Sequence, residues 1–147
     1  MRGTVGRFLG NYLYQVDEKG RVSLPAPFRR GAESPSFVLI RVHPDALTLY
    51  PVEAWARVQD ELRELLKRNP EARHYVLGIT SNAREVTPDK QGRILLPDRH
   101  RKGVGIGHQA LIVGAMDKIE IWEPERFGET VGGEASSFDD LASSIFA

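Results

Sequence analysis

The chain has 147 residues and a formal net charge of zero, so its composition alone gives no bulk attraction to an anionic partner. It contains no cysteine, which excludes a disulfide framework and a thiolate metal site. No apolar run approaches the ~18–20 residues of a membrane helix, and the first residues lack a signal-peptide pattern, so we expect a cytoplasmic protein without a membrane partner.

The first third of the chain predicts four strands and one short helix. A strand near Tyr12–Val16 leads into a tight turn, and a second strand covers Arg21–Leu24. A Leu-Pro pair ends that strand, because proline cannot donate to a β ladder but suits the first turn of a helix. A short basic helix is predicted over Ala26–Arg30, followed by a hairpin of Phe37–Val42 with Ala46–Tyr50.

The middle of the chain predicts two helices. The first is opened by Pro51 and extends to about Arg68, and its apolar residues recur at spacings of three and four, so one of its faces is apolar. Asn69-Pro70-Glu71 is typical of a cap, a first-position proline and an acidic first turn. A second helix is therefore predicted over Ala72–Leu77.

The last part of the chain predicts the same elements again, followed by a tail. The expected strands and basic helix are Ala83–Thr87, Arg93–Leu96, Asp98–Lys102, Ala110–Gly114 and Lys118–Trp122. The Ser-, Gly- and acid-rich stretch from residue 128 is expected to be mobile. Four apolar residues within it are candidates for a docking turn: Phe138, Leu141, Ile145 and Phe146.

The two sets of elements share one register. The segment from Asp17 to Pro25 aligns with the segment from Asp89 to Pro97 at an offset of 72 residues, and the offset persists without a gap to the end of the second hairpin. This pattern indicates a tandem duplication. Each copy supplies only about four short strands, so we expect the two halves to close one β-barrel together.

Aromatic residues also recur at this offset, which places Tyr50 over Trp122 and Trp55 over Phe127. We expect these four side chains to lie in the core or at a subunit interface rather than to contact a ligand.

Each copy contains one Asp-x-x-Gly turn, Asp17–Gly20 in the first and Asp89–Gly92 in the second. Aspartate starts such a turn by accepting backbone N–H bonds, and glycine ends it with a positive φ. Turn chemistry therefore accounts for all four of these residues.

Turn chemistry does not account for the arginine that follows each turn, Arg21 and Arg93. Each arginine either pairs with its own aspartate or is held by it in an orientation suited to a phosphate or a guanine edge, and the two interpretations are compatible. Lys19 lies in the first turn, and its counterpart in the second is Gln91, so we expect the first turn to bind more strongly. Arg and Lys residues gather at residues 2–30 and 84–102, whereas the chain after residue 117 is mainly acidic.

No pattern of catalytic or metal-binding residues is present in the sequence. The four histidines are scattered, without a metal-ligand or nucleophile–base spacing, so we expect no enzyme activity, metal or cofactor. His100 in the basic helix is expected either to contact nucleic acid or to be exposed and inert. The glycines of residues 103–107 lack the Lys-Ser/Thr of a phosphate loop and predict a flexible connector.

The paired Asp-x-x-x-Arg motifs, the trailing Leu-Pro, the Leu-Tyr-Pro-x-x-x-Trp segment and the central helix resemble the MraZ family, from about Met1 to Phe127. The resemblance implies an α+β, mainly β, fold: a double swapped-hairpin barrel of the AbrB/SpoVT type, with a central amphipathic helix and short flanking helices. The expected boundaries are residues 1–55 for the first repeat, 51–78 for the helical connector, 79–127 for the second repeat and 128–147 for the tail.

The resemblance further implies a DNA-binding transcriptional regulator that is associated with the nucleoid. It implies a homo-oligomeric ring bound to promoter-proximal direct repeats upstream of the division and cell-wall gene cluster. The residues expected to contact double-stranded DNA are Arg21, Arg93, Lys19 and Arg7. The alternative is an AbrB-fold scaffold or antitoxin-like protein that binds a partner protein and has no direct role at DNA.

Overall fold

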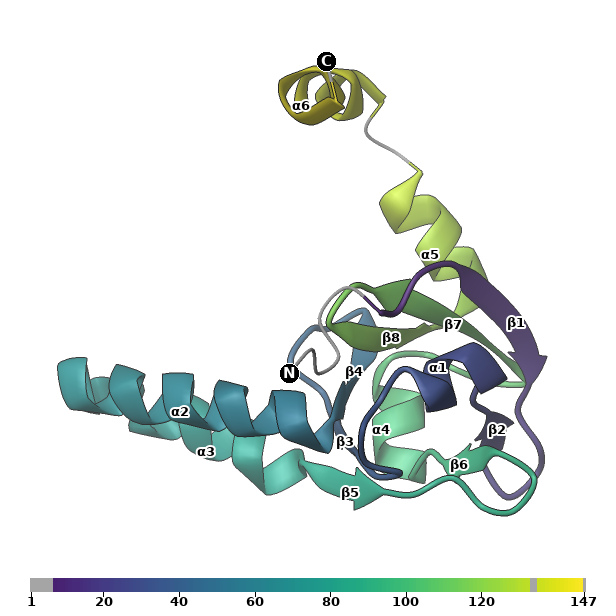
Figure 1. Cartoon of the computed structure of the whole chain (residues 1–147), viewed down its shortest axis with the longest axis horizontal. Helices are drawn as coiled ribbons and strands as arrows, with labels where there is room; N and C mark the ends of the chain where they lie inside the picture. The colour runs from purple at the N-terminus through teal and green to yellow at the C-terminus, as the bar shows by residue number, and fades with distance from the viewer. Residues whose placement is uncertain (1–6, 133–134, 147) are drawn as a thin grey trace.

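Strands from both halves of the chain are combined in one antiparallel sheet (Figure 1). The strands are β1 (Asn11–Gln15), β3 (Phe37–Ile40), β4 (Ala46–Pro51), β5 (Arg84–Val86), β7 (Gln109–Ala115) and β8 (Lys118–Trp122). The computed structural model describes residues 7–132 and 135–146, and the sheet order is β1-β7-β8-β4-β3-β5. The two outer strands are exchanged between the halves of the chain: β1 of the first half pairs with β7 of the second, and β5 of the second half pairs with β3 of the first.

A second, two-stranded sheet is formed by β2 (Arg21–Ser23) and β6 (Arg93–Leu95), with Val22 opposite Ile94. The strands therefore form an open six-stranded sheet and a separate ribbon, not the single closed barrel expected from the sequence. The ribbon is short because a Leu-Pro pair ends each of its strands, and proline cannot extend the ladder. The α+β class is confirmed.

The main core lies between the six-stranded sheet and the ribbon. Its fully buried members include Phe8, Phe28 and Phe37 together with Val22 and Ile94 of the ribbon. The ribbon is thus held by burial of its own apolar side chains as well as by its three paired positions.

β3 is buried on both of its faces because the sheet is covered on both sides. Successive side chains of a strand point to opposite faces, so Phe37 and Leu39 enter the main core whereas Val38 and Ile40 enter a second cluster. The second cluster contains Trp55 from the central helix.

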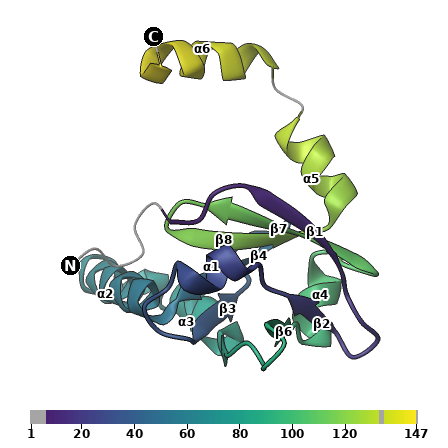
Figure 2. The ribbon, with the colours of Figure 1, turned by 45° about the vertical axis from the view of Figure 1, so that its right-hand side comes forward.

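Two helices form an arm that projects from the sheet on the side away from β2 and β6, as Figures 1 and 2 both show. The arm consists of α2 (Val52–Arg68), a 3-10 turn (Pro70–Ala72) and α3 (Arg73–Asn82). α3 extends past the predicted end at Leu77. Polar side chains also bond to carbonyls of its last turns, since Thr80 Oγ1 donates to Val76 O at 3.0 Å and Asn82 Nδ2 donates to Gly78 O at 2.8 Å.

The short basic helices are α1 (Ala26–Arg30) and α4 (Asp98–Gly103), and each follows one strand of the ribbon. Both agree with the sequence-based prediction to within about one residue. Within the described ranges, no helix has the length and apolarity needed to cross a membrane.

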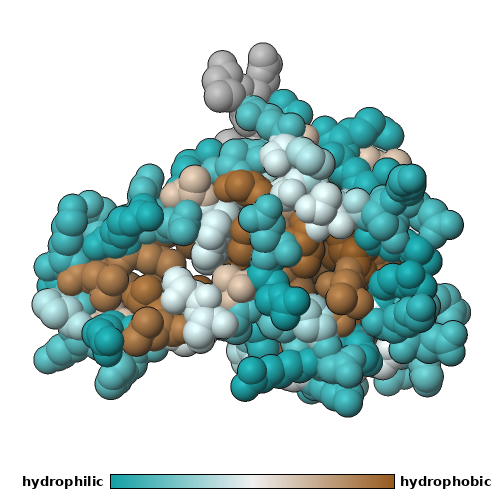
Figure 3. Space-filling model, turned by 90° about the horizontal axis from the view of Figure 1, so that it is seen from below, coloured by the Kyte–Doolittle hydropathy of each residue, from teal (hydrophilic) through white to brown (hydrophobic). Residues whose placement is uncertain are grey.

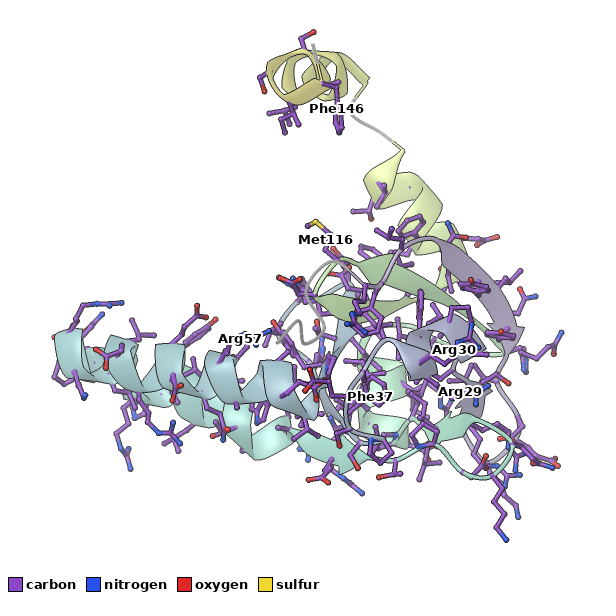
Figure 4. The ribbon with its side chains drawn as sticks, viewed as in Figure 1. Arg29, Arg30, Phe37, Arg57, Met116 and Phe146 are labelled. Atoms are coloured by element: carbon purple, nitrogen blue, oxygen red, sulfur yellow. The ribbon has the colours of Figure 1, made fainter. Side chains whose placement is uncertain are left out.

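The C-terminal part of the chain, which the sequence predicts to be a mobile tail, is helical where the structure describes it. It forms α5 (Pro124–Val131) and α6 (Ala135–Phe146). The start of α5 is set by Glu123, whose side chain accepts a hydrogen bond from Arg126 N at 2.8 Å. The expected docking turn is absent from the described part, because Leu141, Ile145 and Phe146 are exposed. Phe138 lies outside the described side chains (Figure 4).

Candidate functional site

The first Asp-x-x-x-Arg turn joins β1 to β2 and is closed by its own aspartate. Asp17 Oδ1 accepts hydrogen bonds from the backbone N–H groups of Lys19 at 3.0 Å and Arg21 at 2.8 Å, and Oδ2 accepts one from Arg21 Nε at 2.8 Å. Gly20 has a φ of +87°, and a Cβ there would lie 2.9 Å from the backbone oxygen of Leu96. This position therefore requires glycine.

The second turn, between β5 and β6, repeats these contacts. Asp89 Oδ1 accepts from the backbone N–H groups of Gln91 and Arg93, both at 2.9 Å, and Oδ2 accepts from Arg93 Nε at 3.0 Å. Gly92 has a φ of +80°. Each turn therefore fixes the Nε edge of its arginine against a carboxylate.

The same hydrogen bonds set the charge state of the two aspartates. The backbone N–H of Arg21 lowers the pKa of Asp17 below its usual 3.8, and the Arg21 side chain adds to the effect. The backbone N–H and side chain of Arg93 lower the pKa of Asp89 in the same way. Hydrogen bonds to a carboxylate favour its charged form, so both turns contain an ionised pair at neutral pH.

We expect these two pairs to make the stability of the chain depend on pH. A lowered pKa in the folded state stabilises the fold above the unfolded value near 3.8, and the contribution is lost as the pH falls through the folded value. In urea unfolding, the D17N/D89N double variant should have a lower free energy of unfolding than the unchanged chain. This deficit should be constant at neutral pH and should shrink below pH 3.8.

The matched control for this prediction is Asp60→Asn, since Asp60 pairs with Arg63 on the exposed face of α2. Its deficit should be small at every pH. A deficit in D17N/D89N that does not change with pH would contradict the assignment of the two ionised pairs.

The two turns lie side by side, at the lower right of Figure 1, because each is bonded to the strand that follows the other. Leu24 N donates to Gly92 O, and Leu96 N donates to Gly20 O, both at 2.8 Å. These reciprocal bonds lock the relative positions of the turns, so both arginines are presented on one side of the molecule.

Arg21 and Arg93 are both accessible to a ligand. Their side chains are 34% and 29% exposed, and Arg93 Nη1 lies 3.9 Å from Asp17 Oδ2, which links the two turns. Among the described residues, neither Nη of Arg21 has a hydrogen-bond or ion-pair partner. A guanidinium held by one edge offers its remaining donors as a planar fork, which matches a phosphate or the O6 and N7 atoms of guanine.

Two further arginines flank the turns, and sequence reasoning missed them. Arg29 of α1 packs over Gly92, where a Cβ would lie 2.9 Å from the guanidinium carbon, and its Nε donates to Leu24 O at 3.0 Å. Arg101 of α4 lies near Gly20. Figure 4 shows Arg29 on α1, on the side of the molecule where β2 and β6 lie. The signal was present in the sequence, because Arg29 and Arg101 share the 72-residue offset.

The remaining predicted contact residues lie in two places. Lys19 is exposed on the first turn, and Lys90 is exposed on the second, one position before the counterpart of Lys19. Arg7 lies beyond the other end of β1, next to Phe8, which bridges to Met116. The structure therefore brings Lys19 together with Arg21 and Arg93 but does not bring Arg7 to them.

The repeated aromatic residues form two matching pairs within the chain. Trp55 and Trp122 are 9% and 8% exposed. Tyr50 contacts Trp55 with ring centroids 6.0 Å apart, and Phe127 contacts Trp122 at 5.3 Å. Both tryptophans are buried without any partner chain, so they are core residues of this subunit.

Two expectations about α4 and the segment after it are wrong. His100 is buried rather than exposed or available to nucleic acid, because α4 turns its ring toward Asn82, whose carbonyl accepts from Nε2 at 2.7 Å. The glycine-rich connector is anchored rather than free, since Val104 and Ile106 are buried in the main core. In the part of the chain that the structure describes, no group of His, Asp or Glu side chains is arranged to hold a metal ion.

Comparison with known proteins matches most of the chain to one family. The model of the MraZ family, described as "MraZ protein, putative antitoxin-like", matches residues 7–77 and again residues 79–145. A protein of Desulforamulus reducens is 34% identical over 138 residues, which cover 94% of this chain and 96% of the relative. One of Thermomicrobium roseum is 37% identical over 82% of this chain and 84% of the relative. One of Lactiplantibacillus plantarum is 36% identical over 94% and 97%. All three relatives are named "Transcriptional regulator MraZ".

Proposed function

Because this chain belongs to the MraZ family, we propose that it is a sequence-specific DNA-binding transcriptional regulator. Membership of this family confirms the resemblance found in the sequence and the prediction that the chain is not an enzyme. The observation that carries the proposal is the side-by-side placement of Arg21 and Arg93, each held by an aspartate at a turn of the same ribbon.

The β2–β6 ribbon and its two turns form the proposed contact surface for DNA. A two-stranded ribbon is narrow enough to enter the major groove, where a guanidinium fork pairs with guanine or a phosphate. Arg21 and Arg93 supply the forks, Lys19 and Lys90 add charge at the tips, and Arg29 supports the second turn. Arg7 is outside this surface.

One subunit offers only a few such contacts and has no net charge, so it binds DNA weakly. Each neutralised phosphate contributes about 0.9 to the slope of log affinity against log salt. Several identical subunits bound to spaced DNA repeats raise the avidity by roughly a hundredfold or more. Assembly into a homo-oligomeric ring is therefore part of the proposal, with direct repeats upstream of the division and cell-wall gene cluster as its target.

The surface of the subunit supports assembly. Figure 3 shows apolar side chains gathered over the arm formed by α2 and α3. Tyr75 and Leu77 of α3 are 61% and 46% exposed, and Leu13 of β1 is 54% exposed. Apolar patches of this kind on a folded chain mark contacts with other protein surfaces.

The architecture that we propose is a duplicated swapped hairpin. Two observations support it: the family model matches the chain twice, and each outer strand of the sheet pairs with a strand of the other half. In this arrangement each Asp-x-x-x-Arg turn is built by one repeat and held by the other.

Sedimentation velocity tests assembly and DNA binding in one experiment. The protein alone should sediment at a multiple of 16.5 kDa. With a labelled duplex from upstream of its own gene, the protein should form a complex whose affinity falls steeply with salt and exceeds its affinity for a scrambled duplex. A monomeric species with equal affinity for both duplexes would contradict the proposal.

The family description also names an antitoxin-like protein, which favours a partner protein as the second candidate. The two candidates differ in what Arg21 and Arg93 do. Binding to a partner protein through the arm or the tail is unaffected by alanine at these positions, whereas binding to DNA is lost.

A further inference from the structure

A cavity of about 570 Å³ lies beside the start of α4. It is formed by the β3–β4 connection, the end of α3 and the first turn of α4. The residues that line it are Arg41, Val42, His43, Pro44, Ser81, Asn82, Arg84, Pro97, Arg99 and His100. Its volume falls within the range of about 300–1,000 Å³ that is typical of small-molecule sites.

The cavity contains positive charge without any acidic neighbour. Arg41, Arg84 and Arg99 line it, no Asp or Glu does, and none of the three guanidiniums has a carboxylate within salt-bridge distance among the described residues. By contrast, Arg21, Arg93 and Arg101 are each paired with an aspartate. Three arginines that line one hollow without a carboxylate partner attract a ligand with more than one negative charge.

Part of this lining is rigid. Asn82 clasps the backbone of Arg41, since its Oδ1 accepts from Arg41 N at 2.8 Å and its Nδ2 donates to Arg41 O at 3.2 Å. The Arg41 guanidinium lies against Gly103, where a Cβ would be 2.9 Å from Nη1. Any side chain at position 103 would displace this guanidinium, so the glycine leaves room for it.

A buried imidazole supplies an independent observation. His100 is 7% exposed, and its Nε2 donates to the Asn82 carbonyl at 2.7 Å. Its other nitrogen, Nδ1, is sealed from solvent and has no partner among the described residues. A buried polar atom is ordinarily hydrogen-bonded.

We propose that this cavity is a binding site for a small phosphorylated anion with at least two negative charges, of the class of pyrophosphate or a nucleoside diphosphate. Arg41, Arg84 and Arg99 bind the phosphate oxygens, and His100 closes the inner end of the site. Val42, Pro44 and Pro97 provide apolar surface for the remainder of the molecule. The site is distinct from the arginines of the β2–β6 ribbon and does not depend on the proposed contact with DNA.

Isothermal titration of the full chain with inorganic pyrophosphate tests the site, with orthophosphate and a nucleoside diphosphate as parallel ligands. We expect saturable binding of pyrophosphate that is tighter than binding of orthophosphate. Arg84→Ala and Arg99→Ala should each weaken it at least tenfold, and the double variant should show no measurable binding. Both side chains are exposed, so the variants should retain the fold. Arg63→Ala on α2 is the matched control and should bind as the unchanged chain does.

Any of four results would overturn the proposal. One is the absence of binding at millimolar pyrophosphate, which includes the case in which a neighbouring subunit covers the cavity. The second is equal affinity for orthophosphate and pyrophosphate. The third is binding that survives in R84A/R99A. The fourth is loss of pyrophosphate binding in R21A/R93A, which would place the anion on the DNA-binding surface instead.

Discussion

Replacing both Arg21 and Arg93 by alanine should reduce affinity for specific DNA at least about 30-fold, because each guanidinium fork contributes about one to three kcal/mol. The reason is geometric: each aspartate fixes the Nε edge of its arginine, so the fork is oriented before DNA arrives. In an oligomer the loss is repeated in every subunit. Gel-shift titration at fixed salt measures it.

The double variant should also change the salt dependence. If both arginines neutralise phosphates, the slope of log affinity against log salt should fall by about 0.9 for each phosphate that a subunit no longer neutralises. If they bind base edges instead, the slope should remain and discrimination against a scrambled duplex should disappear. An R21K/R93K variant retains the charge without the fork and should recover nonspecific affinity more than specificity.

Two controls separate binding from folding. Arg63→Ala removes a cation from the exposed face of α2, at a distance from the ribbon, and should leave DNA affinity unchanged. Urea unfolding of R21A/R93A shows whether the turns survive without their arginines. A folded R21A/R93A oligomer that binds the operator with the affinity of the unchanged protein would remove the ribbon from the mechanism.

The charges of the neighbouring residues also affect the expected balance between the two turns. The difference between Lys19 and Gln91 predicted that Arg21→Ala would cost more than Arg93→Ala. The residue before Lys19 is Glu18, and the residue before Gln91 is Lys90, so this position reverses the difference in charge between the turns. The second turn is therefore the more basic, and we now expect Arg93→Ala to cost at least as much as Arg21→Ala.

Substitution of Gly114 by alanine should destabilise the chain by about 3–5 kcal/mol, the usual cost of losing a large buried aromatic side chain. The Cβ would overlap with Leu9 N and with the carbonyl carbon of Phe8. Both are backbone atoms, so the segment before β1 must leave the sheet. Phe8 would then leave the core, where it is 0% exposed and contacts Phe28 edge-on at 5.6 Å.

A double-variant cycle in urea unfolding checks this explanation. Phe8→Ala alone should cost about as much as Gly114→Ala, and F8A/G114A should cost little more than either, because both remove the packing of the same side chain. Gly107→Ala is the matched control, since nothing lies within 4 Å of its Cβ position. Additive losses in the double variant would show that Gly114 acts through something other than Phe8.

Most elements could be predicted from the sequence because their signals are local. Proline and glycine mark their ends, and the 72-residue register provides a second indication of each element. The arrangement of the strands could not be predicted in the same way. β1 pairs with a strand about one hundred residues away, and β5 pairs with one about fifty residues away, so local signals do not indicate which edge of the sheet each joins. The separation of the ribbon from the open sheet depends on where Leu-Pro ends β2 and β6.

The candidate site could be predicted where chemistry and turn geometry coincide, at the two Asp-x-x-x-Arg turns. The site could not be predicted where tertiary contacts determine the position of a side chain. Arg29 reaches Gly92 only because the ribbon brings α1 to the other half. His100 lies in a helix rich in Arg and Lys, which predicts an exposed side chain. Its ring is instead buried and donates a hydrogen bond to the Asn82 carbonyl. Arg7 precedes the first strand, β1, whereas the first Asp-x-x-x-Arg turn follows that strand, so Arg7 and the turn lie at opposite ends of β1.

The exchange of β1 and β5 has a consequence for biosynthesis. As the chain leaves the ribosome, β1 emerges about one hundred residues before its partner β7, which is complete only when residue 115 has been translated. The first half therefore has an unpaired strand and exposed apolar side chains until the second half has been made. We expect the sheet to form only after β7 has been translated, at the slow rate typical of distant pairings, and nascent chains that end before β7 to depend on chaperones.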